Sequence, residues 1–193
     1  ARAGERLALL HEPLVAADID LARLTLDDAR EVEAYCFRAM GSVQTLAAIA
    51  SIEVGAVSGD ELAFARRLGA AICRTEHLRD LRADLAAGCL RLPLETISSA
   101  GLDPRELRPD AITPAFAAIL AALREELQGE LQELGRLLDR DARARQRQGL
   151  VLAALHHRLL GQIDHGRELA RTRAEVPAWA KLWTAWSAAL RAA

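Results

Sequence analysis

Residues 60–93 read DELAFARRLGAAICRTEHLRDLRADLAAGCLRLP, and this stretch decides the fold. Its apolar residues recur every three or four positions, which is the spacing of one buried face of an α-helix. Ser58 can cap the start of a helix, and Asp60 and Glu61 place negative charge in its first turn. Gly88 is a typical residue for the end of a helix. The stretch therefore predicts one long helix from Ser58 to Gly88.

The same apolar spacing predicts helices along most of the chain. A first helix should stop before Pro13, because proline disfavours the helical conformation of the residue before it. Prolines and a glycine in residues 92–109 leave room only for short helical turns. The other expected elements are a helix that Thr25 or Asp27 caps and Gly55 ends, helices over residues 2–10, 113–140 and 149–173 and from Pro177 onward, and a charged break or kink over residues 141–148.

The composition favours a single all-α domain. The chain has 193 residues, of which 51% are hydrophobic and 27% are charged. Most of the hydrophobic residues are alanine and leucine, which are strong helix formers, and aromatic residues make up only 4%. The β-branched runs that are typical of strands are missing. We therefore expect one helical bundle over residues 1–193.

Charge and cysteine content exclude several classes of function. Lys and Arg (25) nearly balance Asp and Glu (27), so no excess of positive charge would attract nucleic acid. Cys36, Cys73 and Cys89 share no metal-ligand spacing, so the sequence predicts neither a disulfide framework nor a zinc site. No apolar run is long enough to span a membrane and no signal peptide is visible, which leads us to expect a cytoplasmic protein.

Asp80 and Asp84 are the candidate site on the long helix. Their spacing of four residues places both carboxylates on one helix face, and Glu76 lies one turn earlier on the same stripe. Mg²⁺ binds carboxylate oxygens and can bridge them to a substrate diphosphate. The alternative is that these acids form a solvated face and pair with arginines, because this spacing is common. The arginines available on the helix for such pairs are Arg74, Arg79 and Arg82.

The neighbouring residues resemble the second aspartate-rich motif of squalene and phytoene synthases, LGxAxQLTNILRDVxEDxxxGRxYLP. The matching positions are LGAA at 68–71, Thr75, LRD at 78–80, Asp84, Gly88 and LP at 92–93. Upstream, YCFRAMGSV at 35–43 is similar to the YCxxxAGxVG helix of the family. Downstream, residues 156–158 and 177–183 look like its C-terminal helices. The resemblance covers about residues 27–193, in the order of the family.

The resemblance implies an all-α domain of the isoprenoid synthase type and a Mg²⁺-dependent prenyltransferase. Members of this family use two aspartate-rich motifs to hold Mg²⁺ and two prenyl diphosphates, of the farnesyl or geranylgeranyl type. They join these substrates head to head in isoprenoid biosynthesis, through a cyclopropyl diphosphate intermediate. No catalytic residue is assigned by position. The resemblance implies that Asp80, Asp84 and Glu76 are metal ligands. It implies that Arg79, Arg38 and Tyr35 bind the substrate.

Departures from the family pattern leave two functions open. The first aspartate-rich motif is not found in residues 1–34, so it either lies upstream of Ala1, with the N-terminal helices, or has been lost. Glu76 replaces the asparagine of the second motif, Cys73 its glutamine and Arg91 its tyrosine. The chain is then either a prenyl diphosphate-binding enzyme or a non-catalytic member. Such a member would act as a scaffold or assembly factor through protein partners, as the assembly factors of respiratory complex I do.

Trp179, Trp183 and Trp186 lie on one side of the last predicted helix, since they are spaced by four and three residues. Packing into the core is the favoured interpretation. The alternative is peripheral contact with a membrane, because indole rings beside Lys181 and Arg191 suit the headgroup region.

Overall fold

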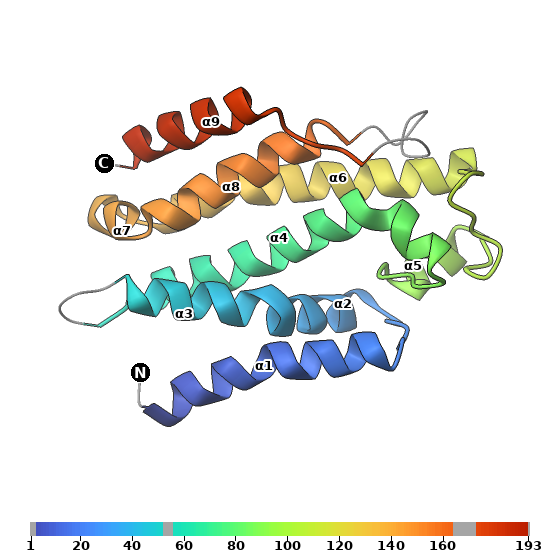
Figure 1. Ribbon diagram of the computed structural model, residues 1–193, viewed down its shortest axis with the longest axis horizontal. Coiled ribbons are helices and arrows are strands. Elements are labelled where there is room, and N and C mark those ends of the chain that lie inside the picture. The colour runs from blue at the N-terminus through green and yellow to red at the C-terminus, as the bar shows by residue number, and fades with distance from the viewer. Residues whose placement is uncertain (1–2, 52–55, 164–172, 193) are drawn as a thin grey trace.

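The computed structural model describes residues 3–51, 56–163 and 173–192, and Figure 1 shows them as a stack of helices. Within these ranges every named element is helical, and the only strand-like feature is an isolated bridge between Arg108 and Ala111. The predicted all-α class is therefore confirmed. None of the helices in the described part of the chain combines the length and apolar character that crossing a membrane requires.

The long helix α4 (Gly59–Ala86) lies in the middle of the stack. Its predicted start is confirmed: the backbone N–H of Glu61 donates to Oγ of Ser58 (3.1 Å), and the N–H of Ser58 donates to Oε2 of Glu61 (3.0 Å). The helix ends at Ala86, and Gly88 adopts a positive φ of 71°. Such a backbone favours glycine, which explains why the chain turns away there.

On one side of α4 lie four helical segments: α1 (Ala3–Leu21), α2 (Ala29–Cys36), the π-helical turn η1 (Phe37–Gly41) and α3 (Ser42–Ala50). The prediction that the first helix stops before Pro13 is wrong, because α1 continues through this residue. Proline removes a single helical hydrogen bond, which packing against η1 and α3 offsets. Asp28 caps α2, instead of Thr25 or Asp27, and the predicted end at Gly55 lies outside the described residues.

On the other side lie α6 (Pro114–Glu133), the 3₁₀ turn η2 (Leu134–Leu137), α7 (Arg140–Arg145) and α8 (Arg147–Leu160), while α5 (Leu94–Ser99) follows α4. Thr113 caps α6 as predicted, but the helix ends before residue 140 because η2 tightens its last turn. The expected helix over 149–173 is too long. A turn begins at Gly161, and residue 173 is not helical.

The last helix, α9 (Ala178–Arg191), follows Pro177 as predicted and packs on the outer side of α8. Its buried residues are Ala180, Thr184 and Ala188. The three tryptophans lie on the opposite side and are 56–68% exposed, so the prediction that they pack into the core is wrong. Small residues face α8 because they allow the two helices to approach closely.

The main hydrophobic core surrounds α4, where it meets α6 and α8. Phe64, Leu68 and Leu81 of α4 are each 1% exposed, and Leu120 of α6 and Leu160 of α8 are completely buried. At about 2 kcal/mol for each fully buried side chain of this size, such contacts supply most of the free energy that stabilises the bundle.

The backbones of α4 and η1 touch at two glycines. A Cβ atom on Gly69 would lie 2.4 Å from Cα of Gly41 and 2.5 Å from the carbonyl oxygen of Met40. Only glycine at position 69 permits this approach. The contact brings the end of α2, with Tyr35 and Cys36, against the middle of α4.

We predict that Gly69→Ala lowers the free energy of unfolding by about 3 kcal/mol, because the added methyl group meets backbone atoms that cannot move aside. Gly129→Ala is the matched control. Gly129 is exposed on α6 with no atom near its Cβ position, so alanine should raise the stability by about 0.5–1 kcal/mol. Urea unfolding of both variants tests whether the two substitutions change the free energy of unfolding in opposite directions. Equal effects would mean that the bundle relaxes around Gly69.

Candidate functional site

Glu76, Asp80 and Asp84 form the acidic face of α4. The side chains of Glu76 and Asp80 are each 29% exposed, and that of Asp84 is 18% exposed. They lie on one side of the helix, because successive members are four residues apart. This is the stripe that the sequence predicts. Each carboxylate is nonetheless engaged by a cationic side chain.

Both oxygens of Asp80 are held by arginine. Arg79 donates from Nε and Nη2 (3.1 and 2.8 Å), and Arg173, which lies between α8 and α9, donates from the same atoms (2.6 and 2.9 Å). Burial alone would raise the pKa of Asp80, but the two guanidinium groups lower it well below its ordinary value. Arg79 also pairs with Glu76. The carboxylates at positions 76 and 80 are therefore shielded from each other.

Arg91 links Asp84 to a second acid. Its Nη1 donates to Asp84 (2.9 Å) and its Nη2 to Asp20 at the end of α1 (2.8 Å). The hydroxyl of Tyr35 donates to the same Asp20 carboxylate (2.9 Å). Burial and the charge of Asp20 raise the pKa of Tyr35 above its ordinary value, so the phenol stays protonated. Tyr35, predicted to bind substrate, is thus joined to Asp84 through Asp20 and Arg91.

Arg38, the other predicted substrate-binding residue, lies on η1 and points to a different partner. Its Nη1 donates to Glu12 of α1 (2.8 Å). This pair ties η1 to α1, whereas Arg79 and Tyr35 belong to the network around the acidic face.

Among the described residues, the two larger hollows that α4 lines lie near its middle and its C-terminal half. The first, of about 300 Å³, is called the cationic hollow, because Arg79, Arg173 and Lys181 line it. Glu76 and His156 lie at its wall, with Nε2 of His156 3.4 Å from Oε1 of Glu76. Its remaining lining is mainly apolar and consists of Leu155, Leu159, Ala174, Glu175 and Val176. Three cations over an apolar floor would suit an anion with an apolar tail.

The second hollow, of about 480 Å³, lies between α2, α4 and α6 and is called the apolar hollow. Most of its lining is apolar: Ala29, Val32, Leu78, Leu92, Pro93, Ile119, Ala122, Leu123 and Leu127. Arg91 lies at its edge. Arg79 lines the cationic hollow and holds Asp80, while Arg91 lines the apolar hollow and holds Asp84. The acidic face is therefore connected to both hollows by its own arginine partners.

The acidic face suits Mg²⁺ by its chemistry, since Mg²⁺ prefers carboxylate oxygens. Its pairing with arginine opposes binding, however. Both Asp80 oxygens already accept hydrogen bonds from two guanidinium groups, and Oδ1 of Asp84 accepts one from Arg91. A cation at Asp80 and Asp84 would therefore compete with Arg173 and Arg91 for the same oxygens.

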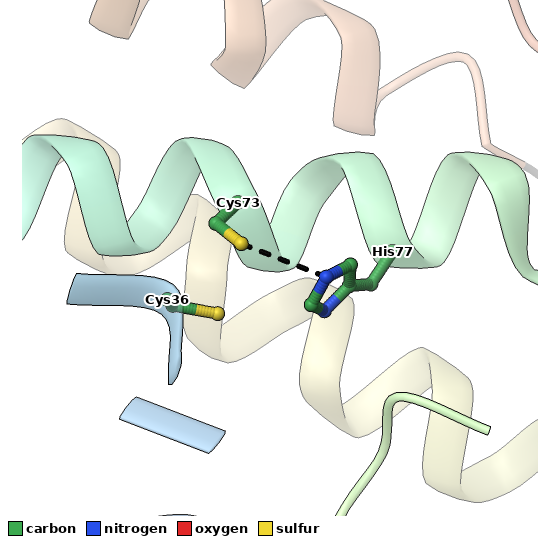
Figure 2. A group of neighbouring side chains, drawn as sticks. All are labelled: Cys36, Cys73 and His77. Carbon is green, nitrogen blue, oxygen red and sulfur yellow. Dashed lines mark hydrogen bonds between the residues drawn. The ribbon is translucent and has the colours of Figure 1, made fainter. Parts of the chain in front are cut away.

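Figure 2 shows a further cluster that sequence spacing did not predict. Cys36, at the end of α2, lies against Cys73 and His77 of α4, and all three are buried. Sγ of Cys73 lies 3.5 Å from Nε2 of His77. The neighbouring Cys36 and His77 side chains lower the pKa of Cys73 below its ordinary value, while Cys73 and burial raise the pKa of Cys36. The cysteines are 37 positions apart, so only the packing of two helices brings them together. The one local signal was the four-residue spacing between Cys73 and His77.

Sequence reasoning also missed Asp20 and Arg173 as members of the site. Asp20 was one of several acids near the start of the chain, and its role depends on where α1 ends relative to α4. Arg173 is far from Asp80 in sequence and was expected inside a helix. Arg91 was noticed only as a departure from the family tyrosine, although its charge could have suggested a partner for Asp84.

Comparison with known proteins agrees with this architecture. The sequence model of the family described as Squalene/phytoene synthase matches residues 7–180. A crystal structure of a dehydrosqualene synthase in complex with ligand superposes with a TM-score of 0.70 at 18% identity, over 95% of this chain and 64% of that one. The fold is thus the all-α isoprenoid synthase type. The chain belongs to the squalene/phytoene synthase family.

Two curated relatives extend this assignment. A phytoene synthase of Thermus thermophilus is 30% identical over 168 residues, which are 83% of this chain and 54% of that protein. A presqualene diphosphate synthase of Rhodopseudomonas palustris is 26% identical over 160 residues, which are 82% of this chain and 55% of that protein. The chain therefore spans about half the length of the curated relatives it matches.

We predict that Arg91→Gln lowers the free energy of unfolding by about 1–2 kcal/mol, because Asp20 and Asp84 lose a charged hydrogen-bond donor in partly buried surroundings. Arg30→Gln is the control. Arg30 pairs with Asp28 at 3.2 Å but its side chain is 92% exposed, so the free energy should stay unchanged. Denaturant unfolding at neutral pH compares the two. If Arg91→Gln also unfolds like the parent, the Asp20–Arg91–Asp84 network does not stabilise the fold.

Proposed function

We propose that this chain supplies a prenyl diphosphate-binding site of the squalene/phytoene synthase type, with Asp80 and Asp84 as its Mg²⁺ ligands. The observation that carries the proposal is the position of the acidic face beside a hollow lined by Arg79, Arg173 and Lys181. Carboxylates that hold a cation and side chains that attract an anion are thus neighbours. When bound, Mg²⁺ neutralises a diphosphate and assists its departure as a leaving group.

The chain's own residues have separable tasks in this proposal. Arg79, Arg173 and Lys181 bind the diphosphate oxygens, and His156 contacts Glu76 at the wall of the hollow, with Nε2 3.4 Å from Oε1. The apolar floor of the cationic hollow, which Leu155, Leu159, Ala174 and Val176 form, contacts the prenyl tail. The volume of this hollow, about 300 Å³, is at the lower end of the range of about 300–1,000 Å³ that is usual for small-molecule sites. A farnesyl or geranylgeranyl diphosphate has the required charge and apolar length.

Head-to-head prenyl transfer is the reaction we propose for a protein that combines this site with a first aspartate-rich motif. A second diphosphate brings further negative charge, and a single acidic pair does not hold enough cation to neutralise it. The relatives, which are a phytoene synthase and a presqualene diphosphate synthase, support this choice of reaction class.

A second candidate function is a non-catalytic scaffold that acts through protein partners. One observation favours it: the positive charges of Arg79, Arg91 and Arg173 already pair with carboxylates of the acidic face. In such a protein the same network would stabilise the fold and nothing more. The two candidates differ in whether Mg²⁺ can displace a guanidinium group.

For the first candidate, we predict that farnesyl diphosphate raises the melting temperature only when Mg²⁺ is present, and that Asp80→Ala with Asp84→Ala abolishes this rise. Glu125→Ala, which removes an exposed carboxylate on α6, is the control and should respond like the parent. Arg173→Ala should tighten the binding of Mg²⁺ alone several-fold, because Asp80 loses a competing cation. Calorimetric titration with Mg²⁺ measures the affinity of the parent and of the Arg173→Ala variant.

The opposite outcome is equally clear. A parent that shows no Mg²⁺-dependent response to farnesyl or geranylgeranyl diphosphate, together with an Arg173→Ala variant that binds Mg²⁺ no better, contradicts the enzyme and favours the scaffold.

We also propose that α9 contacts the surface of an anionic membrane. Trp179, Trp183 and Trp186 are exposed on it beside Leu182 and Leu190. The helix carries no acidic residue, and Arg191 is exposed near its end. Apolar and aromatic side chains with basic neighbours suit anionic phospholipid headgroups. An enzyme with an apolar prenyl substrate would gain access to it there.

All three tryptophans of the chain lie on α9, so intrinsic fluorescence reports on this helix alone. We predict a blue shift on adding vesicles of phosphatidylcholine with phosphatidylserine, and a smaller shift with phosphatidylcholine alone. Trp183→Ala with Trp186→Ala should weaken co-sedimentation with the mixed vesicles at least ten-fold. Leu21→Ala, at an 82% exposed position of α1, is the control. An unshifted spectrum with the mixed vesicles rules out the contact.

A further inference from the structure

The cluster of Cys36, Cys73 and His77 has the composition and compactness of a metal site. The sulfur atoms and one ring nitrogen all lie within 4.8 Å of one another. Figure 2 shows the two sulfur atoms and the imidazole ring pointing toward a common centre from two helices. Cys73 and His77 are one turn apart on α4, and Cys36 comes from the end of α2. This arrangement lies outside the acidic face and uses none of its residues.

The distances are close to those around a tetrahedral zinc ion. With Zn–S near 2.3 Å and Zn–N near 2.0–2.1 Å, a sulfur and a nitrogen ligand lie about 3.6 Å apart, and two sulfur ligands about 3.8 Å apart. The observed distance from Sγ of Cys73 to Nε2 of His77 is 3.5 Å. The longest separation between two ligand atoms in the cluster is at most 4.8 Å. A side-chain rotation that moves one of these atoms by about 1 Å gives the separation expected around zinc.

The histidine has bonding capacity that the described contacts do not use. His77 is only 8% exposed, and its Nδ1 is buried with no hydrogen-bond partner among the described residues. Leaving such a buried atom unpaired destabilises the folded state. His77 also lines the apolar hollow. A metal ion that binds the ring and a water molecule from the hollow would together satisfy both nitrogens.

The ligand set selects the kind of metal. Thiolate and imidazole ligands suit Zn²⁺, whereas Mg²⁺ requires oxygen ligands. The close contact of Gly41 with Gly69 fixes α2 against α4, so the cluster is preorganised. The neighbouring Asp80 and Asp84 would remain available to a hard cation.

We propose that Cys36, Cys73 and His77 bind one Zn²⁺ ion, with water from the apolar hollow in the fourth position. Binding releases the thiol protons to solvent and joins α2 to α4. This site is independent of the proposed prenyl diphosphate binding, since neither its ligands nor its test involve that substrate.

The test is a titration of the full chain, freed of metal with a chelator and kept reduced with a phosphine. Zn²⁺ should bind at one equivalent in competition with a chromophoric chelator, and Co²⁺ should give the intense visible bands of a tetrahedral thiolate complex. Cys73→Ser, Cys36→Ser and His77→Ala should each weaken Zn²⁺ binding at least 100-fold. Cys89→Ser, which alters the partly exposed thiol outside the cluster, should bind like the parent.

The Co²⁺ spectrum of the parent needs no variant, so it decides the matter even if a substitution unfolds the chain. A parent that takes up no Zn²⁺ while reduced, or a Co²⁺ complex without thiolate bands, overturns the proposal. So does a Cys36→Ser variant that retains full affinity. If the reduced parent binds no metal and oxidation joins Cys36 to Cys73, the cluster is instead a redox pair.

Discussion

The close contact between Gly41 and Gly69 is the constraint on which the rest of the structure depends. It lets the backbone of η1 lie against the backbone of α4, with no side chain between them. Because α2 leads directly into η1, the same contact sets the position of Tyr35 and Cys36 relative to α4. The Tyr35–Asp20–Arg91–Asp84 network and the Cys36–Cys73–His77 cluster both follow from this placement.

Local signals in the sequence were sufficient for the starts of α4 and α6 and for the acidic face. The capping box at Ser58, the cap at Thr113 and the spacing of Asp80 and Asp84 act within one or two turns, so the sequence displays them directly. The errors came from effects over longer distances. Packing against η1 and α3 carried α1 through Pro13, and the partners of Asp80 and Asp84 came from residues 173 and 91. The sequence shows that these residues are present, but it does not show which residues lie beside them in the folded chain.

The site has nearly balanced charge in the described residues. Asp20, Glu76, Asp80 and Asp84 face Arg79, Arg91 and Arg173. This balance lets acids of the same sign share one region of a helix, and it explains why the acidic stripe does not destabilise α4. A metal ion that binds Asp80 and Asp84 would have to compete with these arginines for the carboxylate oxygens. The arginines are thus the structural partners of these carboxylates.

The π-helical turn η1 determines which side chains of α2 and α3 face α4. In an uninterrupted α-helix, Cys36 and Thr45 are nine residues apart and would lie on opposite sides, about 180° from each other. The turn accommodates one extra residue, as the bond from the N–H of Ser42 to the carbonyl of Phe37 shows, and this reduces the angle to about 80°. Both side chains are therefore buried. Loss of a single residue from 37–41 would convert the turn into regular α-helix, in which eight residues also span about 80°, so α3 would keep the same face toward α4.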